Sequence, residues 1–271
     1  MEDTISKIAN ELKIITAKPT ALGLRDYGLA GFTLFFFVYA RHNNDAEYEE
    51  FAKKLLDRCL VNVNKNNSRY DLASQFVEMG RIIKLLAEEK YIEIEPAEFS
   101  LLFEKPLMSH LRNNAGVDFG FQTGIVGICD FFLKTSDEQE ALEITLRHIY
   151  SGLGVKGYPE HPIDPLFLFP SEILRDVKIF FLKLEKLNIL IPQKEDLQQA
   201  LHKIESKRIL QSNCPEYNIL QDLREAEIMK DRKKIQSSMQ TIALSSSNLT
   251  IKGLACMSLE DKTLSNWWIL V

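Results

Sequence analysis

One short motif recurs along the chain: a turn of small residues that leads directly into an apolar helix. It is clearest as Gly28-Leu29-Ala30-Gly31 before residues 32–38, and it returns as Gly124-Ile125-Val126-Gly127 before residues 128–133. Less complete copies stand at residues 71–74 and at Gly253-Leu254-Ala255-Cys256. Small residues at the start of a buried helix allow another backbone to approach closely. Because each copy predicts the same structural unit, the repeat constrains the architecture more than any other signal. The glycines expected to carry this packing role are Gly28, Gly31, Gly124, Gly127 and Gly253.

Each motif helix is followed by an amphipathic helix. Residues 29–41 are apolar nearly all round, which is typical of a helix buried on every side. After a turn signal at residues 43–45, one apolar stripe runs at helical spacing through Tyr48, Phe51, Ala52, Leu55 and Cys59. The pattern predicts two further pairs, residues 72–88 with 95–107 and residues 123–134 with 136–152, and Pro106 is expected to kink or end its helix. Further helices are predicted at residues 171–188, 193–207 and about 217–243. Near the N-terminus a short amphipathic stripe at helical spacing consists of Ile5, Ile8, Ala9 and Leu12.

These helical hairpins predict one all-α domain over residues 1–271. Apolar inner helices with amphipathic outer partners are typical of an α/α toroid, either complete or lacking some hairpins. An α-solenoid uses the same elements with open ends and remains the alternative. Prolines at 159, 162, 165 and 170 predict a loop or extended connection over 155–170, between two helical blocks. The terminal Trp267 and Trp268 are expected to pack back onto the body.

The composition argues against several functional classes. The formal net charge of −5 provides no attraction for nucleic acid or an anionic membrane. The longest apolar run, residues 29–40, is shorter than the roughly 20 residues that a membrane span needs. The first residues are acidic and lack the apolar core of a signal peptide. The 4 cysteines show no paired spacing, so we expect reduced thiols and a cytoplasmic location.

At the motif residues the chain resembles the lanthionine synthetase C-like family. The best match is residues 26–35, Asp-Tyr-Gly-Leu-Ala-Gly-Phe-Thr-Leu-Phe, and the segments that follow, 39–41 and 45–48, look like the family's helix-loop-helix continuation. Residues 121–128 and 251–255 look like later copies. The resemblance covers residues 20–150 best, is thin from 155 to 245, and returns at 250–271. It implies a toroid built from up to seven hairpins.

The resemblance also implies a chemistry whose ligands are missing from this sequence. Family cyclases add a cysteine thiol to a dehydrated serine or threonine of a precursor peptide, using zinc held by two cysteines and one histidine. The metal favours the thiolate form. The family places these cysteines in Trp-Cys-x-Gly and Cys-His-Gly, and no cysteine of this chain has either setting. A different site from Cys129, Cys256 and His202 is conceivable, but buried small side chains are the simpler interpretation. We therefore expect no zinc and no other cofactor.

Acid–base catalysis is the other enzymatic alternative. Toroidal glycosidases use paired carboxylates at one end of the ring, and four aspartates lie near the motif turns: Asp26, Asp71, Asp118 and Asp130. Acidic residues at helix starts more commonly cap free N–H groups. The sequence thus favours a non-catalytic binding or accessory protein in peptide modification, with a peptide or a modifying enzyme as partner. A diverged enzyme, either cyclase-like or acting on carbohydrate, is the alternative.

Overall fold

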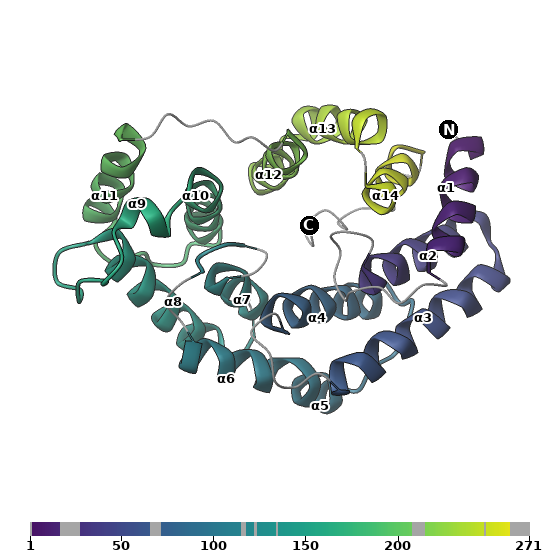
Figure 1. The fold of residues 1–271 in the computed structure, drawn as a ribbon, viewed down its shortest axis with the longest axis horizontal. Coiled ribbons are helices and arrows are strands. Elements are labelled where there is room, and N and C mark those ends of the chain that lie inside the picture. The colour runs from purple at the N-terminus through teal and green to yellow at the C-terminus, as the bar shows by residue number, and fades with distance from the viewer. Residues whose placement is uncertain are drawn as a thin grey trace. The chain divides into compact units, whose positions relative to one another are not determined.

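The computed structural model describes residues 2–16, 28–65, 72–114, 118–121, 124–133, 135–207, 215–246 and 248–260. Every regular element in these segments is helical, which confirms the all-α prediction (Figure 1). The α-helices are α1 (Glu2–Ile15), α2 (Leu29–Asn43), α3 (Ala46–Lys65), α4 (Leu72–Glu88), α5 (Pro96–Phe99), α6 (Lys105–Asn114), α7 (Ile125–Phe132), α8 (Glu138–Leu153), α9 (Pro165–Leu168), α10 (Ser171–Lys186), α11 (Lys194–Ser206), α12 (Pro215–Ile228), α13 (Arg232–Ser245) and α14 (Leu249–Glu260). A π-helical turn, η2 (Ser100–Glu104), joins α5 to α6.

The chain divides into two compact units. Unit 1 comprises Met1–Glu95 and Asp222–Val271, and unit 2 comprises Pro96–Gln221. The later of the two boundaries falls within α12. The Pro-rich connection at residues 155–170 lies inside unit 2, so it does not separate the two units. That residues 1–271 form a single domain stays a prediction.

In unit 1, α2 and α3 pack closely against each other as a hairpin. Every residue of α2 from Leu29 to Ala40 is buried, as its uniformly apolar sequence predicts. Asn44 ends the helix in the left-handed conformation (φ 52°), and Asp45 Oδ1 accepts the N–H groups of Glu47 and Tyr48 at 2.9 and 3.3 Å. An acceptor at this position satisfies N–H groups that open a helix. The predicted turn between the two helices is therefore confirmed.

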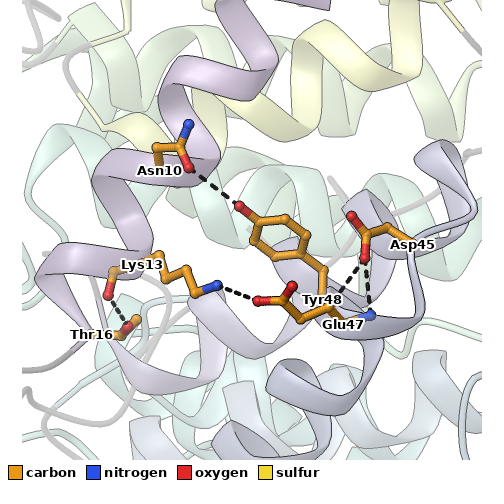
Figure 2. Close-up of polar contacts among 6 residues, drawn as sticks. All are labelled: Asn10, Lys13, Thr16, Asp45, Glu47 and Tyr48. Carbon is orange, nitrogen blue, oxygen red and sulfur yellow. Dashed lines mark hydrogen bonds and ion pairs between the residues drawn. The ribbon is translucent and has the colours of Figure 1, made fainter.

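Helix α1 packs on α2 and α14 through one apolar stripe, which consists of Ile5, Ile8, Ala9 and Leu12, all buried. Polar contacts join α1 to the start of α3, as Figure 2 shows. Lys13 pairs with Glu47 at 3.0 Å and lies 4.9 Å above the centre of the Tyr48 ring. The Tyr48 hydroxyl donates to Asn10 Oδ1 at 3.3 Å. The amphipathic pattern predicted for α1 thus matches its observed contacts.

In unit 2, the helical path from α5 to α6 passes through Pro106 without ending. Proline has no N–H, so an α-helix would leave the Leu102 carbonyl without its usual donor. The chain widens into η2 just before this point, and the Lys105 N–H donates to the carbonyl of Ser100, five residues earlier. Pro106 was expected to kink or end its helix. In the structure a π-helical turn instead accommodates the proline, and the helix continues.

Two other expectations differ from the structure. The helix predicted at residues 217–243 is two helices, α12 and α13, separated at residues 229–231. Lys230 takes a positive φ of 56°, and the Asp231 side chain accepts the Lys234 N–H at 3.1 Å to begin α13. The Pro-rich connection is not wholly extended, because Asp164 caps the short helix α9. The predicted packing of Trp267 and Trp268 falls outside the described residues.

Candidate functional site

The first motif turn lies at the buried start of α2. Gly28 precedes the helix in an extended conformation (φ −61°, ψ 150°), and its carbonyl accepts the Phe32 N–H at 3.2 Å. Gly28 and Gly31 are both buried. Among the described residues, no side chain caps this helix end. The first copy of the motif is therefore a tight entry into a fully buried helix, as predicted.

The second motif turn, at the start of α7, is held by main-chain carbonyl groups. The Asp118 carbonyl accepts the Ile125 N–H at 3.0 Å, and the Gly120 carbonyl accepts those of Gly124 and Gly127 at 3.1 and 3.3 Å. These bonds satisfy N–H groups that a helix start leaves without partners. A Cβ on Gly124 would lie 2.3 Å from the Asp118 carbonyl oxygen. Glycine is required at 124 because backbone atoms pass directly against it.

The glycine of the last motif copy, Gly253, has a different role from the one expected. Gly253 lies inside α14, four residues after the helix begins at Leu249, so the expected turn at this position is wrong. A Cβ there would lie 2.4 Å from Phe35 Cε2 and 3.1 Å from Ile8 Cγ2. Those residues belong to α2 and α1. Gly253 thus permits close packing of three helices rather than a change of chain direction.

Each of the hairpins α2–α3 and α7–α8 buries one cysteine against one threonine. In the first, Thr33 Oγ1 of α2 lies 3.5 Å from Cys59 Sγ of α3. In the second the residue types are exchanged: Cys129 on α7 faces Thr145 on α8, without the geometry of a full hydrogen bond. Thr33 and Cys129 both stand five positions after the first glycine of their motif.

A pair of phenylalanines repeats in the same register. Phe35 and Phe36 pack edge to face with ring centres 5.2 Å apart, at an angle of 85°. Phe131 and Phe132 do the same at 5.3 Å and 89°. Both pairs stand seven and eight positions after the first motif glycine. The two hairpins are therefore equivalent in their side-chain packing as well as in their sequence motif.

Burial controls the state of the cysteines. Burial raises the pKa of the Cys59 thiol to about 12, against the smaller opposing effects of Thr33 and Arg58. Burial likewise raises the pKa of Cys129 far above the usual range. Both side chains are thus neutral thiols at neutral pH, whereas metal ligands and nucleophiles are thiolates.

The residues of the conceivable zinc site occupy unlike positions. Cys129 is buried in unit 2, Cys256 is buried on α14 of unit 1, and His202 is exposed on α11. In the described part of the chain, no group of three or more histidine, cysteine, aspartate and glutamate side chains is arranged to hold a metal ion.

Helix α10 contacts the segment before the second motif and the motif helix α7 itself, and each contact includes one buried carboxylate. Asp176 Oδ2 accepts the Phe121 N–H at 2.9 Å, just before the motif, and its Oδ1 accepts Nε2 of Gln221 at 2.8 Å. Asp130, on α7, forms an ion pair with Lys183. Asp176 and Lys183 stand seven residues apart on α10, so they lie on one face of that helix. These contacts of Asp176 and of the Asp130–Lys183 pair are called the polar clamp below.

The predicted carboxylates have separate partners. Asp118 is exposed, and its Oδ1 accepts the Gly120 N–H at 2.7 Å within the motif loop. Asp130 is committed to Lys183. Asp26 and Asp71 lie outside the described residues. Of the two that the structure describes, Asp118 fits the alternative interpretation of a residue that stabilises the approach to a helix start.

Sequence reasoning missed a set of charged side chains that the fold buries. Their relative exposures are 7% for Glu78, 7% for Arg81, 2% for Asp176 and 5% for Arg224. Charged residues are rarely buried unless they are paired, so each marks a specific interaction. The sequence does indicate the burial of Asp176. This charged residue lies four residues before Phe180, on the otherwise apolar stripe of α10.

Comparison of the chain with models of known protein families, with curated proteins and with solved structures finds no match. Within the described residues, no helix is both long enough and apolar enough to cross a membrane.

Proposed function

We propose that this protein is a non-catalytic relative of the lanthionine synthetase C-like family that binds a peptide or a peptide-modifying enzyme. The proposal is supported by the structural role of the motif residues. The residues that carry the resemblance, Gly28 and Gly124 with their helices, serve helix packing. The cysteines of the same hairpins are neutral, buried thiols. This combination preserves the scaffold of a cyclase and omits its metal chemistry.

The proposed scaffold is an α/α toroid in which the motif helices converge on one axis. The equivalence of the hairpins α2–α3 and α7–α8 supports a repeated architecture. The packing of Gly253 against Phe35 supports a further inner position for α14. An experimental structure in which α2, α7 and α14 line one axis would support the toroid, whereas an open stack of hairpins would support the solenoid.

A peptide that carries both reacting groups tests the function. The probe is a synthetic peptide with a dehydroalanine and a cysteine four residues apart, labelled with a fluorophore. We expect saturable binding by fluorescence anisotropy and no acceleration of thioether formation, which mass spectrometry detects as loss of the alkylatable thiol. A peptide with alanine at both reactive positions separates recognition of the reactive groups from recognition of the remaining sequence.

A second experiment tests whether zinc takes part in any reaction. The reaction is repeated with added Zn²⁺, and the metal content of the purified chain is measured. Zinc-dependent loss of the peptide thiol, or stoichiometric zinc lost in a Cys129→Ser variant, would contradict a non-catalytic role. Failure of both peptides to bind would contradict a peptide partner.

A further inference from the structure

The start of α3 holds the ammonium group of Lys13 with the two kinds of group that recognise an organic cation. Lys13 Nζ lies 3.0 Å from Oε1 of Glu47 (Figure 2), and 4.9 and 5.6 Å from the ring centres of Tyr48 and Phe51. Aromatic faces within about 6 Å attract a cation, and a carboxylate adds a charge-assisted hydrogen bond. Glu47, Tyr48 and Phe51 together are called the ammonium site.

The rings of the ammonium site are held in place from α2. Phe36, which is fully buried, stacks on Tyr48 with ring centres 5.6 Å apart and an angle of 8°. The same ring meets Phe51 edge to face at 4.8 Å and 90°, and Tyr39 packs against the Tyr48 ring at 4.8 Å and 75°. These contacts do not involve Lys13, so the site keeps its shape when the ammonium leaves. A preformed site binds a ligand without the cost of ordering its own side chains.

The Lys13 side chain can leave the site while α1 stays in place. Its side chain is 39% exposed and that of Glu47 is 81% exposed, and ion pairs in such positions contribute little to stability. The backbone of α1 is held by other groups, because Leu12 is buried and Arg58 donates to the Thr16 carbonyl at 3.1 Å. Exchange of the bound cation therefore requires a rotation of one side chain and no movement of a helix.

We propose that the ammonium site binds a lysine side chain of a peptide partner, and that Lys13 occupies the site as an internal competitor. This inference rests on the proposed function, because the peptide partner is proposed there, and it specifies one side chain that the peptide contributes. The site holds a compact ammonium on a flexible four-carbon stem, which is the group that a lysine of a peptide also presents. The contact between α1 and α3 is thus autoinhibitory.

The probe is N-acetyl-lysine N-methylamide, a single lysine flanked by peptide groups. It is titrated into the full-length chain labelled with carbon-13 in its tyrosine rings, and NMR follows the Tyr48 signal, which is assigned by its loss in Tyr48→Phe. We expect a saturable shift of this signal. Lys13→Ala should bind the probe about threefold more tightly, the factor that corresponds to Lys13 occupying the site about two-thirds of the time. Alanine preserves the helix, since it has the highest helix propensity.

Two variants with the same change of charge distinguish the site from general attraction to an acidic surface. In the Lys13→Ala chain, Glu47→Gln should weaken probe binding about threefold. Glu50→Gln should leave it unchanged, because Glu50 is an exposed residue of the same helix that pairs with Lys54 at 3.7 Å. Phe51→Leu keeps an apolar side chain and removes the ring face, so it should also weaken binding about threefold.

Three results would overturn the proposal. The first is a Tyr48 signal in Lys13→Ala that does not respond to the probe, and the second is equal weakening by Glu47→Gln and Glu50→Gln. The third is binding of n-butylammonium as tight as that of the blocked lysine, because a site for a peptide must also recognise the flanking peptide groups. N-acetyl-norleucine N-methylamide, which has an uncharged stem, should produce no shift.

The test is independent of the one for the proposed function when the dehydroalanine peptide and its alanine control are made without lysine. Binding of those peptides without a response to the blocked lysine would overturn the ammonium site and leave the proposed function intact. Binding of the blocked lysine without binding of either peptide would support the ammonium site and contradict recognition of the cyclase-type peptide.

Discussion

The hairpins α2–α3 and α7–α8 place the same packing devices in the same register, but at one buried position an apolar side chain of the first corresponds to a charged side chain of the second. Six residues after the first motif glycine, α2 has Leu34 and α7 has Asp130. Leu34 is fully buried in an apolar helix, whereas Asp130 is ion-paired with Lys183 of α10. The difference teaches that the motif specifies a hairpin without specifying what packs around it.

The neighbouring helices account for this difference. Unit 1 surrounds α2 with the apolar stripe of α1, with α4 and with α14. In unit 2, α10 supplies Asp176 to the segment before α7, at Phe121, and Lys183 to Asp130 on this shorter helix. Buried polar pairs seldom add stability relative to apolar packing, but breaking one is costly. We infer that α7 is fixed in position by its clamp, and α2 by its length and apolar surface.

The largest expected effect is that of alanine at Gly124. The obstacle to a Cβ there is backbone, which cannot move aside as a side chain can, so we expect a loss of about 3 kcal/mol or more of unfolding free energy. Urea unfolding measures it. Gly154→Ala is the matched control: no atom lies within 4 Å of its Cβ position, and φ is 69°. Positive φ alone should cost about 1 kcal/mol. A loss at 124 no larger than at 154 would refute the close approach.

Removing one member of the clamp comes next. Lys183→Met leaves the Asp130 carboxylate buried without its cation, and we expect a loss of about 2 kcal/mol, reduced because the Lys183 side chain is 27% exposed. The double variant Asp130→Leu/Lys183→Met imitates Leu34 of the first hairpin and should fall within about 1 kcal/mol of the unaltered chain. A double-mutant cycle by urea unfolding compares them. Equal losses in both variants would show that the hairpins are not interchangeable at this position.

Alanine at Gly253 should cost less than alanine at Gly124, about 2 kcal/mol, because its closest obstacle is the Phe35 ring rather than backbone. That ring is fixed by contacts with Phe36 and Tyr39. The variant Phe35→Leu provides space for the new methyl group, so the combined loss should be smaller than the sum of the two single losses. Thermal unfolding measures this coupling. Simple additivity would mean that Gly253 and Phe35 do not press on each other.

We expect the buried cysteine–threonine pairs to have a smaller effect on stability, and this effect should depend on pH. Because burial raises the pKa of Cys59 to about 12, iodoacetamide should label this thiol slowly in the folded chain at pH values where the unfolded chain reacts readily. Above the ordinary thiol pKa of about 8.5 the unfolded chain loses its proton first, so stability should fall as the pH rises. The exchanged pair Thr33→Cys/Cys59→Thr copies the order of the second hairpin and should change stability by less than about 1 kcal/mol. Rapid labelling of folded protein would contradict the burial of Cys59.

The smallest effect is expected on the surface of unit 1. Lys13→Gln removes the exposed ion pair with Glu47 and the contact with the Tyr48 ring, at a cost of about 0.5 kcal/mol. The loss should shrink at high salt, whereas that of Lys183→Met should persist because its carboxylate is buried. Unfolding at low and high ionic strength distinguishes the two pairs. An equal response to salt would contradict the difference in burial.

The sequence predicts individual helices well where the apolar residues recur at helical spacing on one face. The bounds of α4 agree with the periodic pattern, and the buried stripe of α1 agrees residue by residue. The motif turns at Gly28 and Gly124 were predictable because small residues and a uniformly apolar run adjoin there. The break at residues 229–231 was missed, since neither proline nor glycine marks it. Its signal is Asp231, three residues before Lys234, in the position of a capping side chain.

The candidate site was predictable only in part, because its partners are distant in the sequence. Asp130 stood out, but Lys183, 53 positions away, carried no local sign of its role. Asp176 and Gln221 likewise require knowledge of which helices meet. The role of Gly253 depends on Ile8 and Phe35, which are distant in the sequence, so the local pattern indicates a turn where the structure has close helix packing. A local sequence pattern therefore predicts the helix in which a residue lies. The contacts that define its role come from helices that are distant in the sequence.

The π-helical turn before Pro106 has a consequence for the spacing of side chains. Phe99, Phe103, Leu107 and Leu111 recur every four residues, although an α-helix overshoots a full turn by about 40° in four residues. The wider turn absorbs part of that overshoot. Phe99 can therefore stack on Phe131 while Leu107 and Leu111 remain buried further along. Deleting a single residue from this turn would rotate everything before it by about a quarter turn, so this segment tolerates substitution far better than a change of length.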